Sequence, residues 1–195
     1  MYVTIGARAR AEGLVGLLLE CHDRIRTFAD LAIAIGDRLD APTAHITDAC
    51  ARCERYFSEA LPLHVADEEE SLLPRLRSRS PALEAAFATM HAQHTEHEAR
   101  LRALLDGLAK VRQNPDDTAQ RELVRTTAAQ LRVDFEAHLS NEEMRIFPAI
   151  EDLLTPDEQA QIIGELRARR QIPTPAASHR SSRSTAGASL HETKR

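Results

Sequence analysis

The segment HVADEEESLLP at residues 64–74 recurs as HLSNEEMRIFP at residues 138–148. Both copies contain a histidine, three residues, two glutamates, three residues, a large apolar residue and a proline. One histidine, two glutamates and one proline at matching offsets argue against chance. An internal repeat of this kind predicts two halves of similar design.

Helix geometry selects the acid that shares a face with each histidine. Each residue of an α-helix turns by about 100°, so the residue at i+4 lies about 40° from position i and one turn along. Glu68 therefore shares a face with His64, and Glu142 shares a face with His138. A histidine and a glutamate at this spacing can present a nitrogen and a carboxylate to one ion.

The other acids of the repeat are expected to be peripheral. Glu69 and Glu143, at i+5, lie about 140° from the two histidines by the same arithmetic and should face solvent. Glu70 is expected to belong to the same solvated surface. Asp67 falls on the near side at i+3, but Asn141 replaces it in the second copy, which makes Asp67 the weaker candidate.

Four long helical stretches follow one another with short breakers between them. We expect them over about 12–36, 43–77, 82–112 and 118–147, each with an apolar stripe. Pro62 should kink the second stretch, and Pro74 and Pro148 should each end a helix beyond its motif. A fifth, short helix is predicted after the capping box TPDE at 155–158.

Long helices with short connections predict an all-α protein, an up-down-up-down four-helix bundle. We assign residues 12–170 to this bundle, including the short C-terminal fifth helix, and residues 1–11 to an N-terminal lead. Residues 171–195 are rich in Ser, Pro and Arg and have almost no large apolar side chains, so we expect a disordered tail there.

Composition narrows the class of protein. The 195 residues suit one domain, and the net charge of −5, with no basic face, argues against a nucleic-acid partner. Three cysteines do not suggest a secreted disulfide framework, and no apolar run is long enough to span a bilayer, so we expect a cytoplasmic protein without a membrane partner. Cys50 and Cys53 are expected to pack in the core as small hydrophobic residues.

Both repeated His–Glu pairs lie on apolar stripes. Phe57 and Cys53 precede His64 on its stripe, and Leu131 and Phe135 precede His138 on the other. A buried ionised carboxylate is costly unless it is paired or coordinates a metal. Two such pairs in one bundle core therefore predict a bound cation.

The first and third helices supply further histidines on their apolar faces. His22 lies on the stripe of the first helix. In MHAQHTEHE at residues 90–98, His94 is best centred on the apolar face, His97 is moderately off axis, and His91 lies at the margin. The expected metal ligands are His22, His64, Glu68, His94, His138 and Glu142.

Four histidines and two glutamates exceed the ligand set of a structural tetrahedral zinc. Because two carboxylates can bridge, two metal ions are the natural count. Imidazole and carboxylate suit iron, manganese, zinc or nickel. The protein ligands alone leave coordination positions at which a small molecule could bind. Neither the Glu-x-x-His motif of ferritin-like bundles nor the His-Glu-x-x-His motif of zinc proteases is present.

These motifs resemble the hemerythrin-like (HHE cation-binding) family over roughly residues 12–170, through CHDRIR, HVADEEESLLP, AQHTEHEARLRALL and HLSNEEMRIFP. The resemblance implies a four-helix bundle around a non-haem diiron centre, with Glu68 and Glu142 as bridges and the four histidines named above as terminal ligands. Classical oxygen carriers have two ligand histidines on the third helix. His97 or His91 could therefore replace or join His94, although a spacing of three residues departs from the carriers' spacing of four.

Family members bind dioxygen or nitric oxide, sense oxygen or iron, or act in iron–sulfur repair and peroxide defence. The expectation is a protein with two iron ions, or manganese or zinc in their place, that binds or senses O2, NO or a related redox species, or handles iron. Its expected partner is a small diatomic or peroxide ligand, and no protein partner is indicated. One alternative is an enzyme that consumes peroxide or delivers iron for iron–sulfur repair. Another is a bundle with a structural metal that acts as an interaction module. No acid, base or nucleophile stands out beyond the ligands, so the question of enzymatic activity stays open.

Overall fold

The computed structural model describes residues 13–38 and 40–171, and every regular element in these ranges is helical. Three π-helical turns interrupt the α-helices without breaking the rods they form, and one 3-10 turn ends the second rod. In chain order the α-helices are α1 (Gly13–Asp37), α2 (Thr43–Arg55), α3 (Leu61–Ala66), α4 (Leu73–Leu76), α5 (Pro81–Gln113), α6 (Thr118–Asn141), α7 (Phe147–Leu153) and α8 (Pro156–Gln171).

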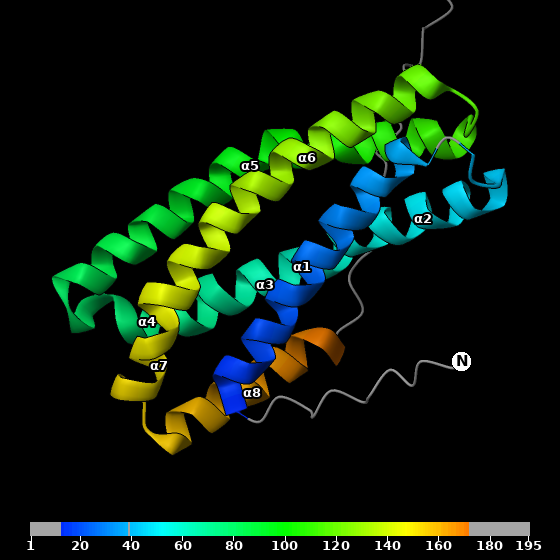
Figure 1. Ribbon diagram of the computed structural model, residues 1–195. Helices are drawn as coiled ribbons and strands as arrows, with labels where there is room; N and C mark the ends of the chain where they lie inside the picture. Colours follow the sequence, from blue (N-terminus) through cyan, green and yellow to red (C-terminus); the bar gives the residue numbers. More distant parts are fainter. Residues whose placement is uncertain (1–12, 39, 172–195) are drawn as a thin grey trace, which may run out of the picture.

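Four long rods form a bundle (Figure 1). The first is α1, the second runs from α2 through α4, the third is α5, and the fourth runs from α6 through α7. Each rod packs against two others, because α1 contacts α2 and α6 while α5 contacts the same two helices. The predicted all-α four-helix bundle is confirmed. No described helix combines the length and the apolar character needed to cross a membrane.

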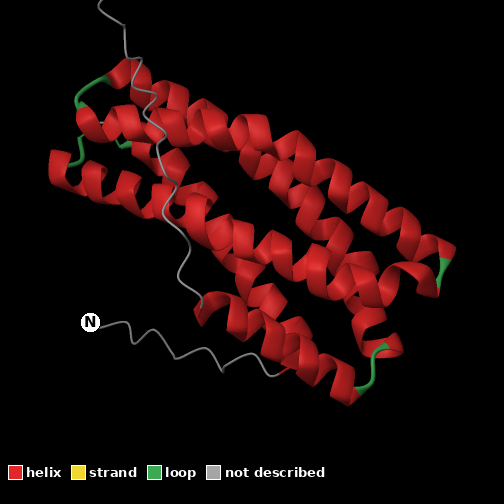
Figure 2. Cartoon of the chain, turned by 180° about the vertical axis from the view of Figure 1, so that it is seen from behind, coloured by secondary structure: helices red, strands yellow, loops and turns green. Residues whose placement is uncertain are grey.

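The shorter helix α8 lies outside the four rods, as seen from both sides in Figures 1 and 2. It packs along α1 and across the second of the two π turns of the second rod, Asp67–Leu72. The predicted capping box starts it: the Glu158 carboxylate accepts from the Thr155 backbone N–H at 2.8 Å, and the Thr155 hydroxyl accepts from the Glu158 N–H at 3.3 Å. The expected N-terminal lead and the tail beyond Gln171 lie outside the described residues.

Prolines do not end the rods, contrary to the prediction for Pro74 and Pro148. The helix continues past both of them, and past Pro62, after a π-helical turn in each case. A proline has no backbone N–H, and its ring clashes with the carbonyl four residues earlier. Widening the preceding turn to i→i+5 hydrogen bonding relieves that clash and keeps the rod continuous. Each π turn ends two residues before its proline: Tyr56–Ala60, Asp67–Leu72 and Glu142–Ile146.

The apolar core consists of two clusters with a gap between them. One cluster fills the end of the bundle formed by α2 and the facing parts of the other rods; its largest members include Ile25, Phe57, Leu104, Leu131 and Phe135. The second fills the other end, beneath α8; its members include Leu18, Leu72, Phe87, Ile146 and Phe147. Polar side chains, among them the predicted histidines and glutamates, lie along the rods between the two clusters.

Candidate metal centre

A layer of polar side chains separates the two apolar clusters, and all four rods contribute to it. The layer brings together every residue that was predicted as a metal ligand. His94 is the most exposed of the six, with 11% of its side chain accessible, and the others are buried. The six residues are His22 on α1, His64 and Glu68 on the second rod, His94 on α5, and His138 and Glu142 on the fourth rod.

The ligand-type atoms of this layer form two groups, and within each group all of them lie within 4.8 Å of one another. His22 and His64 form one group with the two carboxylates of Glu68 and Glu142. The other group consists of His94 and His138 with the same two carboxylates. Each group therefore offers two imidazole nitrogens and two carboxylate oxygens.

Each carboxylate divides its oxygens between the two groups. Oε1 of Glu68 lies 2.9 Å from Nε2 of His64, and its Oε2 lies 3.3 Å from Nε2 of His94. Oε2 of Glu142 lies 3.0 Å from Nε2 of His22, and its Oε1 lies 2.9 Å from Nε2 of His138. A carboxylate placed in this way can bridge two cations.

The atoms that converge here are unsatisfied in the protein alone. Despite these short separations, the oxygens of Glu68 and Glu142 and the Nε2 atoms of His22, His64 and His94 have no properly oriented hydrogen bond from another described residue. Each buried polar atom left without a partner costs about 1–3 kcal/mol. A cluster of buried polar atoms without partners is typical of a site that binds cations. The donor set of imidazole and carboxylate suits iron, manganese or zinc.

The carboxylates also control the charge of the histidines. Burial alone would lower the pKa of His64, but the adjacent Glu68 carboxylate outweighs it, and the pKa lies well above its usual value. Burial would likewise raise the pKa of Glu68, but His64 holds it well below the usual value. Without a cation, this buried pair is therefore ionised.

A second set of side chains orients the imidazoles. Glu143 faces Nδ1 of His22 at 2.8 Å, and Glu69 faces Nδ1 of His94 at 2.9 Å. Because a carboxylate accepts hydrogen bonds, each Nδ1 is the donor, which leaves Nε2 as the nitrogen that can bind a cation. The amide oxygen of Gln93 does the same for His138, with Nδ1 at 3.1 Å.

The prediction that Glu69 and Glu143 face solvent is wrong. Both are half-buried and reach the histidine of a neighbouring rod. The predicted angle assumed a regular α-helix, whereas both glutamates lie within the wider π turns, where each residue turns through a smaller angle. Glu70, by contrast, is exposed as predicted, and its carboxylate pairs with Arg169.

The three histidines of α5 have different positions. His94 belongs to a group, whereas His91 is 67% exposed and its Nδ1 lies 3.0 Å from Oε1 of Glu69 at the surface. His97 is buried, but its ring nitrogens belong to neither group. Burial, followed by the nearby charge of His138, lowers the pKa of His97 to about 4, so its imidazole is neutral at physiological pH.

Comparison with known proteins agrees with this geometry. The family model for the hemerythrin HHE cation-binding domain matches residues 13–150, which include the first three rods in full and the fourth as far as Ile150. The chain belongs to this hemerythrin family. A protein of Haemophilus influenzae whose printed name is "Uncharacterized protein" is 22% identical over 160 residues, which cover 81% of this chain and 90% of the relative.

In this hemerythrin-family bundle, a cavity of about 270 Å³ opens beside the polar layer. His64, His94 and His138 form its inner wall. The rest of the wall is mostly apolar, with Ile25, Phe57, Leu61, Leu101 and Phe135, while His97 and Glu98 add polar groups. A small molecule that enters this cavity can reach the histidines of both groups.

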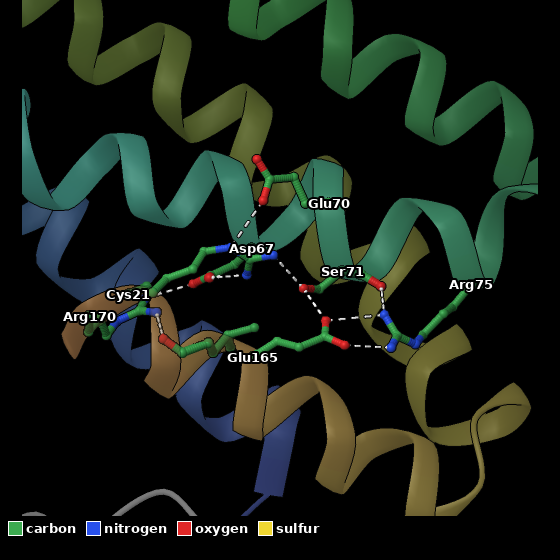
Figure 3. A network of polar contacts seen from close by, with 9 residues as sticks. Cys21, Asp67, Glu70, Ser71, Arg75, Glu165 and Arg170 are labelled. Atoms are coloured by element: carbon green, nitrogen blue, oxygen red, sulfur yellow. Dashed lines mark hydrogen bonds and ion pairs between the residues drawn. The ribbon is translucent and has the colours of Figure 1, made fainter. Parts of the chain in front are cut away.

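Asp67 does not turn toward the centre, although it adjoins Glu68. Its carboxylate is completely buried and accepts from Arg169 at 2.9 Å and from Arg170 at 2.6 Å, both on α8 (Figure 3). Arg170 also contacts the thiol of Cys21 on α1. The helix α8 lies beyond the matched residues 13–150. The contacts of Asp67 therefore fasten an additional helix to the π turn that carries Glu68.

The same network extends along α8 away from the centre. The Ser71 hydroxyl donates to Glu165 at 2.6 Å, and Arg75 donates to the other oxygen of Glu165 at 2.7 Å (Figure 3). Two consecutive turns of the second rod are thus tied to α8. The sequence alone did not identify these contacts.

Cys50 and Cys53 lie in the core, as expected. Both are free, buried and part of the first apolar cluster. Burial raises the pKa of Cys50 to about 11 and that of Cys53 to about 12, so both thiols stay protonated. Neither belongs to a candidate metal group in the described residues.

Proposed function

We propose that this protein holds a non-haem dinuclear centre, with two iron ions in the native state, and binds a small redox-active molecule there. The division of the Glu68 and Glu142 oxygens between two histidine pairs carries the proposal. A single tetrahedral ion would not need two carboxylates that each face both pairs.

In this proposal each side chain has a defined role. The Nε2 atoms of the four histidines are terminal ligands, and Glu68 and Glu142 are the bridges. Glu143, Glu69 and Gln93 hold the imidazoles in the required tautomer and orientation. Iron, when bound, would supply electron transfer and open coordination positions. The free cysteines support a reducing, cytoplasmic location.

The cavity supports a small ligand. Its volume of about 270 Å³ admits a diatomic molecule, azide or peroxide together with water. Its apolar wall keeps bulk water away from the inner histidines, which strengthens electrostatic interactions at the centre. Binding or sensing of O2, NO or a related species is therefore the function that fits best.

Metal analysis and optical spectroscopy of the purified full chain test the proposal. We expect about two irons per chain from the carboxylate-bridge argument, and ferric absorption bands that change when azide or nitric oxide is added. His138→Ala combined with Glu142→Ala should abolish both. One tightly held zinc ion and no iron would overturn the proposal and leave a structural metal in an interaction module.

The second candidate is enzymatic use of the same centre, either peroxide consumption or iron delivery for iron–sulfur repair. The observation that favours it is the cavity, which places the ionisable groups of His97 and Glu98 beside two ligand histidines. Rapid consumption of peroxide by the iron-loaded chain, lost in Glu68→Ala, would support an enzyme. Binding of azide without turnover of peroxide would favour a carrier or sensor.

A further inference from the structure

His97 is a buried polar residue with no role among the proposed ligands. It is 5% exposed and lines the cavity together with His94 and His138. Its ring stands edge to face against Phe135, with centroids 5.2 Å apart, and against His138, with centroids 5.5 Å apart. These contacts fix the ring at the wall of the cavity.

The nitrogens of this ring are not used by the protein. Within residues 13–38 and 40–171, no hydrogen bond engages either nitrogen of His97, whereas His22, His94 and His138 each have a partner at Nδ1. Both nitrogens also keep accessible surface, because neither is among the fully buried atoms without a partner in the described residues. The nitrogens are therefore available to a molecule in the cavity.

We propose that His97 donates a hydrogen bond to the outer atom of the small molecule bound in the cavity. This bond makes the site selective for anionic ligands of the azide and hydroperoxide class over weak acceptors such as nitric oxide. An imidazole has at least one N–H in either protonation state, so donation does not depend on titration of His97. The inference rests on the proposed function and specifies the ligand class of that same site.

Four full-length variants test this role. His97→Phe keeps the aromatic ring and removes the donor, and His97→Leu is a second variant without a donor. His97→Gln restores an N–H group. Leu101→Ala, at another wall position, alters the cavity without changing any hydrogen-bonding group. For each variant, the iron content, the azide dissociation constant of the ferric form and the nitric oxide affinity of the ferrous form are measured.

We expect azide to bind roughly 10- to 100-fold more weakly to His97→Phe and His97→Leu, as for loss of a hydrogen bond to a charged group. His97→Gln should recover most of the azide affinity, and Leu101→Ala should change the azide affinity by less than about threefold. In all four variants, the nitric oxide affinity and the iron content should stay near those of the unmodified protein.

Two results would overturn the role of His97. If all three His97 variants bind azide as tightly as the unmodified protein does, His97 makes no hydrogen bond to the ligand. Loss of iron in His97→Phe and His97→Leu alike would make His97 a metal ligand. Failure of the proposed function is distinguishable from both, because the unmodified protein would then lack two irons or azide-sensitive bands.

Discussion

Nδ1 of His22 lies 2.8 Å from Oε1 of Glu143, a residue of the π turn on the neighbouring fourth rod. Arg26 donates to the same carboxylate oxygen at 3.0 Å, which holds Glu143 in place. The hydrogen bond holds the His22 ring with Nε2 toward Glu142. The residue that follows the proposed bridge thus orients a proposed ligand on another helix.

Replacing Glu143 with alanine should weaken metal binding. Loss of an outer-sphere carboxylate typically lowers metal affinity by about 10- to 100-fold. Competition with a chelator of known affinity measures the change. Glu151→Ala is the matched control, because Glu151 is an exposed acid on the following helix, α7. Equal affinities in the two variants would contradict an orienting role for Glu143.

Variants that lack the Glu68 carboxylate or the His94 imidazole should retain different numbers of metal ions. Each oxygen of Glu68 faces a different histidine pair, so Glu68→Ala removes a donor from both groups. His94→Ala removes a donor from one group and leaves the His22 and His64 group complete. After gel filtration, we expect little metal in Glu68→Ala and about one ion per chain in His94→Ala by this donor count. Retention of the full complement by Glu68→Ala would rule out a bridge there.

The bundle and the inner layer of the centre follow from local rules of sequence. The repeated His-x3-Glu spacing places each pair on one helix face, and apolar periodicity turns that face inward. The start of α8 also follows from sequence, since Thr155 and Glu158 are close neighbours that satisfy each other. The clustering of the six candidate residues needed only these rules and the topology of four antiparallel rods.

The outer layer could not be predicted in the same way. The directions of Glu69 and Glu143 depend on π turns, and a proline in the sequence could as well have ended the helix. The burial of Asp67 depends on α8, whose arginines are about 100 residues away in sequence. His97 lies moderately off the axis of the apolar stripe, and only the packed bundle shows the cavity beside it.

Metal binding should release protons and strengthen as pH rises. The pKa of His64 lies well above 6.5 in the metal-free protein, so its imidazole is protonated at neutral pH and a metal ion must displace that proton. Raising the pH toward that pKa removes the competing proton. Calorimetric titration in buffers of different ionisation enthalpy should show net proton release at pH 7. No release would mean that His64 is already neutral or is not a ligand.

The metal-free protein should show a related pH dependence of stability. The raised pKa of His64 contributes stability that is fully present below its ordinary value of 6.5 and is lost as pH rises through the folded value. The lowered pKa of Glu68 contributes stability that is present above 4.5 and is lost as pH falls through its folded value. The pair therefore contributes fully between pH 4.5 and 6.5. Urea denaturation of the protein after a chelator has removed its metal, at pH values within, below and above this range, measures the effect.

The buried carboxylate of Asp67 should make its two arginine partners essential for stability. Arg169→Leu combined with Arg170→Leu leaves a completely buried charge unpaired. Breaking a buried ion pair from one side costs about 3–5 kcal/mol. The free energy of unfolding of the metal-free chain in urea measures this loss. Arg167→Leu is the control, because Arg167 is exposed on the same helix and its replacement should cost no more than about 0.5 kcal/mol.

Adding Asp67→Asn to the double leucine variant should restore much of the lost stability. Asparagine removes the buried charge and reproduces the residue that the second copy of the repeat has at position 141. In the otherwise unmodified chain, Asp67→Asn should cost less than the double variant, because both arginines are partly exposed and can turn toward water. This dependence of one change on the other is the non-additivity expected for residues in direct contact. If the double leucine variant loses the same stability with aspartate or asparagine at position 67, the arginines stabilise α8 through other contacts and not through this ion pair.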